Sequence, residues 1–328
     1  GKPLDALKTL IKAESTIQPV ILLLEDAVWL DKHSRQFVQQ LARNVEGYPF
    51  AIIAAQRPEP GLPALVPDET RHVTLPLTNL NQEQVTAFIA DLLKGPASSS
   101  LVALVVSRAN GNPFFVEQLI MLLDEEEALE EGKEGWQLNT DGALAADSLP
   151  NNVRALLTAR LDRLPPVVRE IVQTASVLGR EFDRNVLSEM LANDAELEYC
   201  LDRAGRALVW SAMDDARYLF RHALLRDSAY EMQLQSRRRF LHLRAADAVR
   251  VTYDNDPTPH YAEMAHHYHF GEARDDERTY AVLAGDHAAA EFANDDALRF
   301  YSRSLALTES DDRHEQRSLL LRREAVFD

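Results

Sequence analysis

Cysteine is almost absent from this chain, since Cys200 is the one cysteine among 328 residues. A single cysteine excludes an internal disulfide framework and a metal cluster built from cysteines. Long apolar runs are absent as well, and no segment has the pattern of a secretory signal peptide. These absences predict a protein without a membrane anchor that works in a reducing compartment, the cytoplasm.

Positive charge is also scarce, with 35 Lys and Arg residues against 52 Asp and Glu residues and a formal net charge of -17. Nonspecific binding of nucleic acid needs clustered cations that contact phosphates, so DNA binding is disfavoured. The one basic run, Arg237-Arg238-Arg239, is interpreted as a solvated helix face. A hydrophobic content of 46% still provides for buried cores, and the length suggests two or three domains.

The most informative segment is the apolar run at 20–24, Val-Ile-Leu-Leu-Leu, which Glu25 and Asp26 follow directly. Such a run predicts a strand that is buried on both faces. Carboxylates just past the end of a strand lie where α/β sheets bind ligands, and in P-loop ATPases an acid there helps to hold Mg²⁺. The simpler alternative is a buried strand that ends in solvated acids.

A second apolar run at 50–55 predicts another buried strand, and Arg57 follows it closely. Helical spacing at 4–13 and 34–44, the latter with Ser34 as a possible N-cap, alternates with the two runs. This order is typical of a parallel sheet with crossover helices. The guanidinium of Arg57 is suited to phosphate, and its alternative role is a salt bridge at the sheet edge.

The following part of the chain is predicted to be mostly helical. Pro113 is expected to terminate a helix, and Pro150 opens a different region. Three short helices followed by a hairpin are the order of a winged-helix module, and the chain after it is helical almost to its end. The predicted segments are a loop at 58–70, a short strand at 73–75, helices at 81–93 (capped by Asn81), 101–109 and 114–123, exposed acidic residues at 124–134, a small ribbon at 135–138, helices at 153–164, 167–178 and 187–191, and strands at 207–210 and 217–220.

Together these segments resemble the signal-transduction ATPases with numerous domains (STAND). Within that class the chain is most similar to the bacterial group attached to adenylate or guanylate cyclases, Ser/Thr kinases and LuxR-type regulators. The segment Leu-Glu-Asp-Ala-Val-Trp-Leu-Asp at 24–31 resembles that group's Walker B segment, where His is common at the place of Val28. The other similar segments are 55–58 (sensor 1), 111–117 (lid motif), 161–165 and 175–179 (winged helix) and 221–227 (the end of that module).

The resemblance implies roles for single residues. Glu25 or Asp26 would bind Mg²⁺ while the neighbouring acid orients the attacking water, and Arg57 would face the γ-phosphate. Pro113 would pack near the adenine. A His at the place of His222 contacts the ADP phosphate in related plant and animal ATPases, although Ala223 replaces the acid that usually follows it.

Several nearby residues are expected to be structural. Asp31 is predicted to be a helix N-terminal acid rather than a metal ligand, and Phe114 and Phe115 are predicted to lie in the core. Of His266, His267 and His269, only the first and last could share a helix face, and without a carboxylate at matching spacing a metal site is disfavoured. Near the end of the chain, the spacing of Gly285, Ala297, Tyr301 and Ser304 is similar to that of tetratricopeptide (TPR) helix pairs.

A P-loop reads G-x-x-x-x-G-K-[ST], and no such string occurs in the chain. Gly1-Lys2 is followed by Pro3, which offers neither a hydroxyl for Mg²⁺ nor an N–H for phosphate. In the family the P-loop lies many tens of residues before Walker B, so we expect it outside this chain. ATP, ADP and Mg²⁺ are then cofactors of a longer parent protein, and this chain is expected neither to hydrolyse ATP nor to bind it at micromolar affinity.

The predicted fold is mostly α with a partial α/β core. Its parts are a truncated parallel P-loop sheet at 1–78, a helical lid at 79–149, a winged helix at 150–235 and TPR-like helices at 236–328. The predicted function is that of a nucleotide-switched signalling ATPase whose partners are an effector domain of the same polypeptide and proteins bound through the helical repeats. A protein-interaction module without nucleotide function is the alternative, and a DNA-binding regulator is disfavoured by charge.

Overall fold

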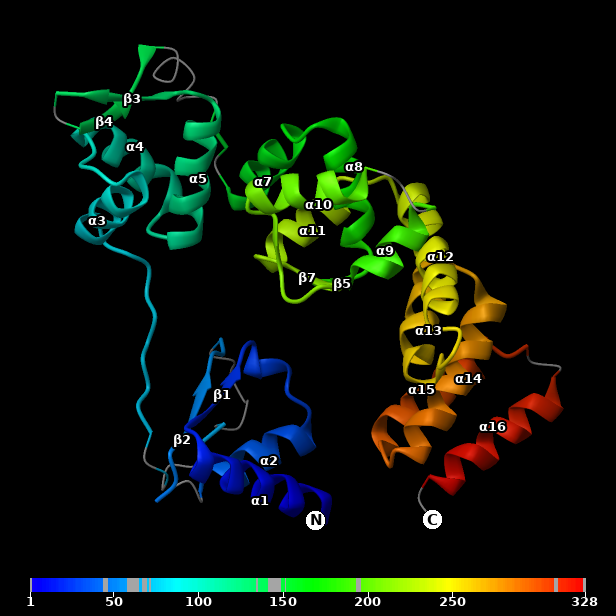
Figure 1. Cartoon of the computed structure of the whole chain (residues 1–328). Helices are drawn as coiled ribbons and strands as arrows, with labels where there is room; N and C mark the ends of the chain where they lie inside the picture. Colours follow the sequence, from blue (N-terminus) through cyan, green and yellow to red (C-terminus); the bar gives the residue numbers. More distant parts are fainter. Residues whose placement is uncertain are drawn as a thin grey trace. The chain divides into compact units, whose positions relative to one another are not determined.

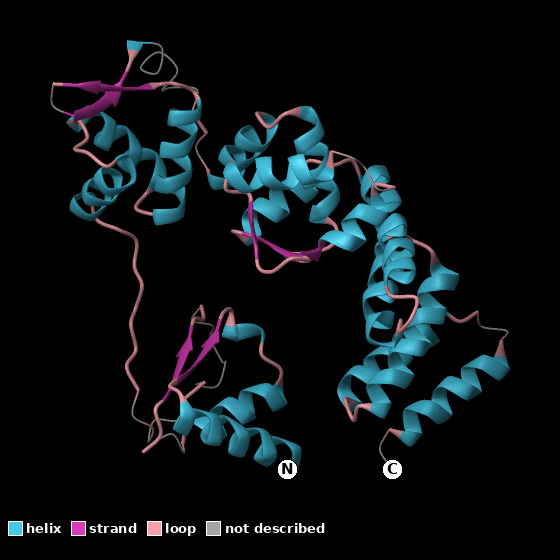
Figure 2. Ribbon diagram, in the orientation of Figure 1, coloured by secondary structure: helices cyan, strands magenta, loops and turns pink. Residues whose placement is uncertain are grey.

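The computed structural model describes residues 2–43, 47–57, 65–66, 70, 72–133, 135–140, 149–150, 152–192, 196–309 and 312–326. The chain divides into two compact units, 1–78 and 79–328, and each is described by itself (Figure 1). The structure is mostly helical with small sheets, as predicted (Figure 2). The finer domain boundaries within 79–328 stay predictions.

The first unit is built on two parallel strands, β1 (Val20–Leu24) and β2 (Phe50–Ala54). Helix α1 (Lys2–Ile17) precedes β1, and α2 (Lys32–Ala42) lies between the strands in the sequence. The predicted alternation of helix and strand is therefore confirmed. Most of the predicted loop at 58–70 lies outside the described residues.

One face of the small sheet differs from the prediction. Ile21 and Leu23 are 66% and 58% exposed, so β1 is not buried on both faces. Successive side chains of a strand point to opposite faces, and the buried cluster of this unit packs against the face that carries Leu24 and Ile52. The prediction was wrong because an apolar run does not reveal which of its two faces has a packing partner.

The start of α2 also corrects a prediction. Ser34 was expected as the N-cap, but the cap is Asp31, whose Oδ1 accepts hydrogen bonds from the backbone N–H groups of His33 and Ser34 at 2.8 and 2.9 Å. The Ser34 hydroxyl donates to the same carboxylate at 2.5 Å. The expectation that Asp31 is a helix N-terminal acid is thus confirmed.

The second unit begins with a group of helices that pack around a core of aliphatic side chains. Asn81 caps the first of them and forms a capping box with Gln84. The acidic stretch at 124–134 was expected to be exposed, and part of it forms a strand. Residues 73–75 are described by the structure and do not form the expected strand. The elements are α3 (Gln82–Leu93), α4 (Ser99–Ala109), α5 (Pro113–Glu125), β3 (Leu129–Gly132) and β4 (Gly135–Leu138).

The tight turn between α4 and α5 explains the segment Gly-Asn-Pro at 111–113. Gly111 has a φ of +72°, and a Cβ there would lie 2.2 Å from the Leu80 carbonyl oxygen. Asn112 caps α5 through the N–H of Phe115. Pro113 is the first residue of α5, where the missing N–H costs no helical hydrogen bond. Pro113 therefore begins a helix and does not terminate one.

After the helix α7, the next elements have the order of a winged helix: a helix, a strand, two helices and a hairpin. Their strands form one antiparallel sheet in the order β5-β7-β6, and Trp210 and Phe220 are buried in the core beneath it. The prediction missed one helix, α10, and the strand β5. The elements are α7 (Val153–Asp162), α8 (Pro166–Ser176), β5 (Glu181–Asp183), α9 (Arg184–Met190), α10 (Leu197–Arg206), β6 (Trp210–Ala212) and β7 (Arg217–Phe220).

The remainder is helical, as predicted, and from α12 onward each helix packs against the next (Figure 1). Gly285 of α14 faces the ring of Tyr301 of α15, and Ala297 and Ser304 are fully buried, as in the expected TPR helix pair. Among the described residues, no helix combines the length and apolar character that spanning a membrane requires. The helices are α11 (Ala223–Glu231), α12 (Gln235–Thr252), α13 (Tyr261–Phe270), α14 (Arg274–Ala290), α15 (Asn294–Leu307) and α16 (Arg313–Ala325).

Candidate functional site

The predicted catalytic residues, Glu25 and Asp26, directly follow β1 at the carboxyl end of the parallel pair β1–β2. Hydrogen bonding continues past both strands, because the N–H of Ala55 donates to the Leu24 oxygen at 2.8 Å and the N–H of Ala27 donates to the Ala55 oxygen at 2.9 Å. Glu25 and Asp26 therefore follow β1 beside Ala55, which lies two residues before Arg57. Glu25, Asp26 and Arg57 are all exposed.

The backbone at the acid pair is bent sharply. Asp26 has φ 48° and ψ 44°, in the left-handed region that costs a non-glycine residue about 1 kcal/mol. It precedes a short 3₁₀ turn, η1 (Ala27–Trp29), and the buried Arg35 donates from Nη2 to the Ala27 oxygen at 3.0 Å. Asp31 is engaged in capping α2, and the hydroxyl of Ser34 is the main cause that lowers the pKa of its carboxyl.

In the second unit the structure brings together two predicted nucleotide segments that are far apart in the sequence. His222 is the N-cap residue of α11, where its Nδ1 accepts from the N–H of Leu224 at 3.4 Å. The ring of Phe114, next to Pro113 at the start of α5, stacks on the imidazole with centroids 3.8 Å apart and an interplanar angle of 17°. Pro113 itself is exposed. Phe114 is half-buried and packs against the winged-helix core, whereas Phe115 is buried in the lid core.

Charges of both signs act on this imidazole. Burial is the main cause that lowers the pKa of His222, the charge of Arg180 lowers it further, and Glu117 acts in the opposite direction. Glu117 lies three residues after Phe114 on α5. Arg180 lies beside His222 because its carbonyl oxygen accepts from the N–H of Phe220 at 2.8 Å. Sequence reasoning missed Arg180 and Glu117 as neighbours of His222, since Glu117 lies inside the 111–117 motif that was interpreted by itself and Arg180 lies just outside the 175–179 segment.

The histidines on α13 lie differently from the pair that the sequence suggested. His267, not His266 or His269, joins a buried chain in which its Nδ1 lies 2.9 Å from Nδ1 of His242, and Nε2 of His242 lies 2.9 Å from the Tyr230 hydroxyl. His269 instead contacts Glu277. No group of three potential metal ligands occurs within the described ranges. The buried chain joins α11, α12 and α13.

This buried chain should make stability depend on pH. Burial lowers the pKa of His242 to about 4, and the charges of His266, Arg226, Arg238 and His269 lower it further. Burial lowers the pKa of His267 to about 3, and the charges of His242 and His266 lower it further. The unfolded chain takes up protons below its ordinary histidine pKa of about 6.5, so stability is complete above that pH and is lost as the pH falls toward 4. We expect a loss of roughly 2–4 kcal/mol between pH 7 and 5.

Urea unfolding at pH 7, 6 and 5 measures this loss. The double variant His242→Gln and His267→Gln, which keeps polar groups but cannot titrate, should show a markedly smaller dependence on pH. His314→Gln, at an exposed position, serves as the control and should behave like the wild type. Equal pH dependence in the double variant and the wild type would contradict the assignment.

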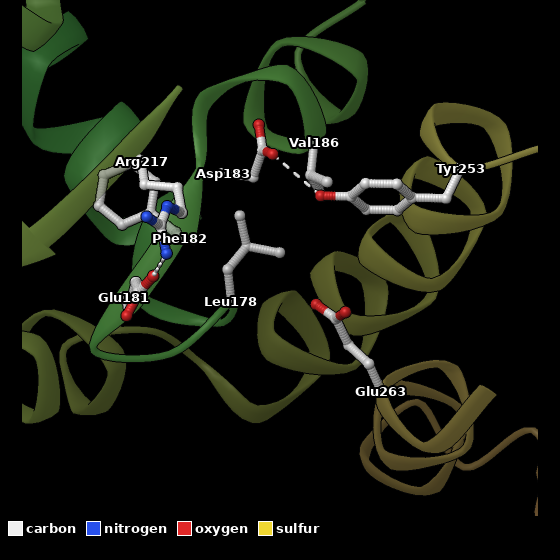
Figure 3. Close-up of a pocket in the computed structure, with 8 residues that line it drawn as sticks. All are labelled: Leu178, Glu181, Phe182, Asp183, Val186, Arg217, Tyr253 and Glu263. Carbon is white, nitrogen blue, oxygen red and sulfur yellow. Dashed lines mark hydrogen bonds and ion pairs between the residues drawn. The ribbon is translucent and has the colours of Figure 1, made fainter. Parts of the chain in front are cut away.

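A pocket of about 230 Å³ lies where the winged helix meets α12 and α13 (Figure 3). Its charged groups are engaged with protein partners: Arg217 with Glu181 at 3.2 Å, and Asp183 with the hydroxyl of Tyr253 at 2.9 Å. Glu263 contacts His260 at 3.0 Å. Of these contacts, the hydrogen bond between Tyr253 and Asp183 joins the two sets of elements. The pocket contains none of the residues predicted to bind nucleotide.

Comparison with known proteins identifies the fold. No protein family model matches the chain. The chain is 23% identical over 262 residues to an uncharacterized protein of Rhizobium meliloti strain 1021, a match over 74% of this chain and 24% of that protein. It also matches the crystal structure of a STAND protein with a tetratricopeptide repeat sensor from Pyrococcus horikoshii, with a TM-score of 0.56, 14% identity and coverage of 97% of this chain and 44% of that one.

The fold is STAND-like. The mostly helical architecture with small sheets and successive packed helices agrees with this similarity. The chain spans about a quarter of the length of the Rhizobium protein and less than half of the Pyrococcus chain.

Proposed function

We propose that this chain is part of a nucleotide-switched signalling ATPase, in which exchange between ADP and ATP controls an effector domain outside these 328 residues. The observation that carries the proposal is the placement of Glu25, Asp26 and Arg57 at the ends of two adjacent parallel strands. An acid pair and an arginine at the same end of a sheet suit a magnesium-bound phosphate, because Mg²⁺ takes oxygen ligands and Arg pairs with phosphate. The STAND-like fold supports the same proposal.

The roles follow the chemistry of each group. Mg²⁺, when bound, would neutralise phosphate charge, and Glu25 or Asp26 would hold it together with a P-loop supplied by the longer protein. Arg57 would contact the γ-phosphate. Pro113 and His222 would contact the adenine and the ADP phosphate, and the stack of Phe114 on His222 keeps their segments together.

In this proposal ADP favours the arrangement in which lid and winged helix hold the core, and ATP favours its release. Such a ligand shifts populations only by the difference of its affinity for the two states. The effector would be a nucleotide cyclase, a Ser/Thr kinase or a LuxR-type regulator, acting in the cytoplasm. The packed helices at 236–328 would bind protein partners.

Calorimetric titration of the natural full-length protein with Mg-ADP tests the proposal. We expect micromolar binding that Asp26→Asn weakens at least about tenfold, equivalent to 1.4 kcal/mol. In a parallel titration with Mg-ATP, Arg57→Ala should weaken binding by a similar factor while leaving Mg-ADP binding unchanged, because Arg57 would contact the γ-phosphate. Asp31→Asn is the matched control, because Asp31 caps α2 and should change stability rather than affinity. The 328-residue chain alone should show no micromolar binding. Absence of binding by the full-length protein, or equal losses in Asp31→Asn and Asp26→Asn, would contradict the proposal.

A protein-interaction module without nucleotide function is the second candidate. The observation in its favour is the regular packing of α13 to α16, where Gly285, Ala297 and Tyr301 bring neighbouring helices into contact. It predicts partner binding that is the same with ADP, with ATP and without nucleotide. A DNA-binding role has less support, because α10 of the winged helix carries Glu198 and Asp202 beside Arg203 and Arg206.

A further inference from the structure

The contact between Phe114 and His222 joins two helix N-termini. His222 caps α11 through Nδ1, which accepts a backbone N–H and therefore carries a lone pair, so the neutral ring has its proton on Nε2. One face of the ring lies on Phe114, which begins α5. Rotation of the imidazole would lose both the stack and the cap. The orientation of His222 thus depends on a residue of the lid helix.

Two residues of opposite charge act on the imidazole of His222. Arg180 comes from the turn after α8, and Glu117 comes from α5. The helix that His222 caps, α11, contributes the N–H of Leu224. Further along α11, Arg226 donates to the Ser176 oxygen at 2.7 Å and pairs with Asp227. Protonation of Nδ1 would end the cap, because a protonated nitrogen cannot accept. Together with burial and Arg180, the cap favours the neutral ring.

We propose that Phe114 is a positioning residue for His222: the stacked ring holds the imidazole at the N-terminus of α11 in the orientation in which it contacts an approaching phosphate. The phosphate part rests on the proposed function, and its ligand class is a nucleoside diphosphate. The positioning part stands on the stack and the cap alone. A phosphate beside the ring adds negative charge and should therefore raise the pKa of His222.

An NMR titration of the histidine side chains in this chain tests the positioning part, with His222 assigned through His222→Gln. The wild-type pKa of His222 should lie below its ordinary value. Phe114→Leu should raise it by about half a unit or more through added hydration, Arg180→Gln should raise it, and Glu117→Gln should lower it. Glu231→Gln, at the far end of α11 and paired with Arg154, should leave it unchanged.

The pattern of signs separates positioning from a general loss of structure. Phe114→Leu keeps an apolar side chain, and fluorescence of the buried Trp210 reports whether the winged-helix core persists. A pKa of His222 that is the same in Phe114→Leu and in the wild type would overturn the positioning role. A rise in Glu117→Gln would overturn the role given to the flanking charges.

Titration with inorganic pyrophosphate at millimolar concentration tests the phosphate part. We expect the pKa of His222 to rise in the wild type and to respond less in Arg180→Gln. If the protein variants shift the pKa while pyrophosphate does not, the positioning role is upheld and the phosphate role is overturned. Failure of nucleotide binding by the full-length protein would overturn the proposed function and leave the variant shifts intact, so the two outcomes are distinguishable.

Discussion

Replacing Arg160 by methionine should lower the free energy of unfolding by about 3 kcal/mol. Arg160 lies on α7 and is 6% exposed. Its guanidinium donates to Gln118 and to both carboxylate oxygens of Glu125 on α5, and to the carbonyl oxygen of Ala207 at 3.2 Å. Methionine keeps the length of the stem but leaves the buried amide of Gln118 and the carbonyl of Ala207 without this donor. Glu125 retains some access to water, so the lower end of the range for broken buried ion pairs applies.

Arg154 provides a matched control on the same helix. It also pairs with a glutamate, Glu231, but both side chains are largely exposed. Arg154→Met should therefore change the free energy of unfolding by no more than about 0.5 kcal/mol. Urea unfolding followed by tryptophan fluorescence compares the two variants. Equal, small shifts would contradict the view that Arg160 joins the lid helix to the winged helix.

Replacing Gly285 by leucine should cost about 3 kcal/mol or more, and even Gly285→Ala should be destabilising. A Cβ at Gly285 would lie 2.6 Å from Cε1 of Tyr301. The tyrosine cannot easily withdraw, because it is buried and its hydroxyl donates to Asp286 at 2.8 Å. Overpacking costs about 1–3 kcal/mol, which exceeds the gain of about 0.5–1 kcal/mol that alanine brings to a helix interior.

Gly205 of α10 offers the opposite case. A Cβ at Gly205 meets no atom within 4 Å, so Gly205→Ala should stabilise the protein by about 0.5–1 kcal/mol. Thermal unfolding of both alanine variants gives the two signs in one experiment. Stabilisation by Gly285→Ala would show that α14 and α15 are not packed as closely as the TPR pattern requires.

Features that depend on the local sequence pattern, such as strands and helix caps, could be predicted from the sequence. The apolar runs predicted β1 and β2, and the acid three residues before Ser34 was correctly interpreted as a helix N-terminal acid. Helix α10 was missed although Leu197, Cys200, Leu201 and Ala204 have helical spacing and are buried, so a usable signal was present. The sequence contained no comparable signal that Ile21 is exposed, because burial depends on what packs against the strand.

Contacts between distant segments were the least predictable. Phe114 was expected to lie in the core, and nothing near it in the sequence indicates that its ring stacks on His222. Likewise, His267 pairs with His242 of another helix, while sequence reasoning compared it only with its neighbours on α13. Helical spacing shows which residues share a face but does not show what that face meets.

The most direct test of the nucleotide site is hydrogen–deuterium exchange in the natural full-length protein, compared without nucleotide, with Mg-ADP and with Mg-ATP. Our account predicts that ADP slows exchange at the ends of β1 and β2 (24–27 and 54–57), at the start of α5 (111–117) and at the start of α11 (220–225). It predicts that ATP protects the first two segments while the last two exchange faster than with ADP. Unchanged exchange in all four segments, despite bound nucleotide, would contradict the account.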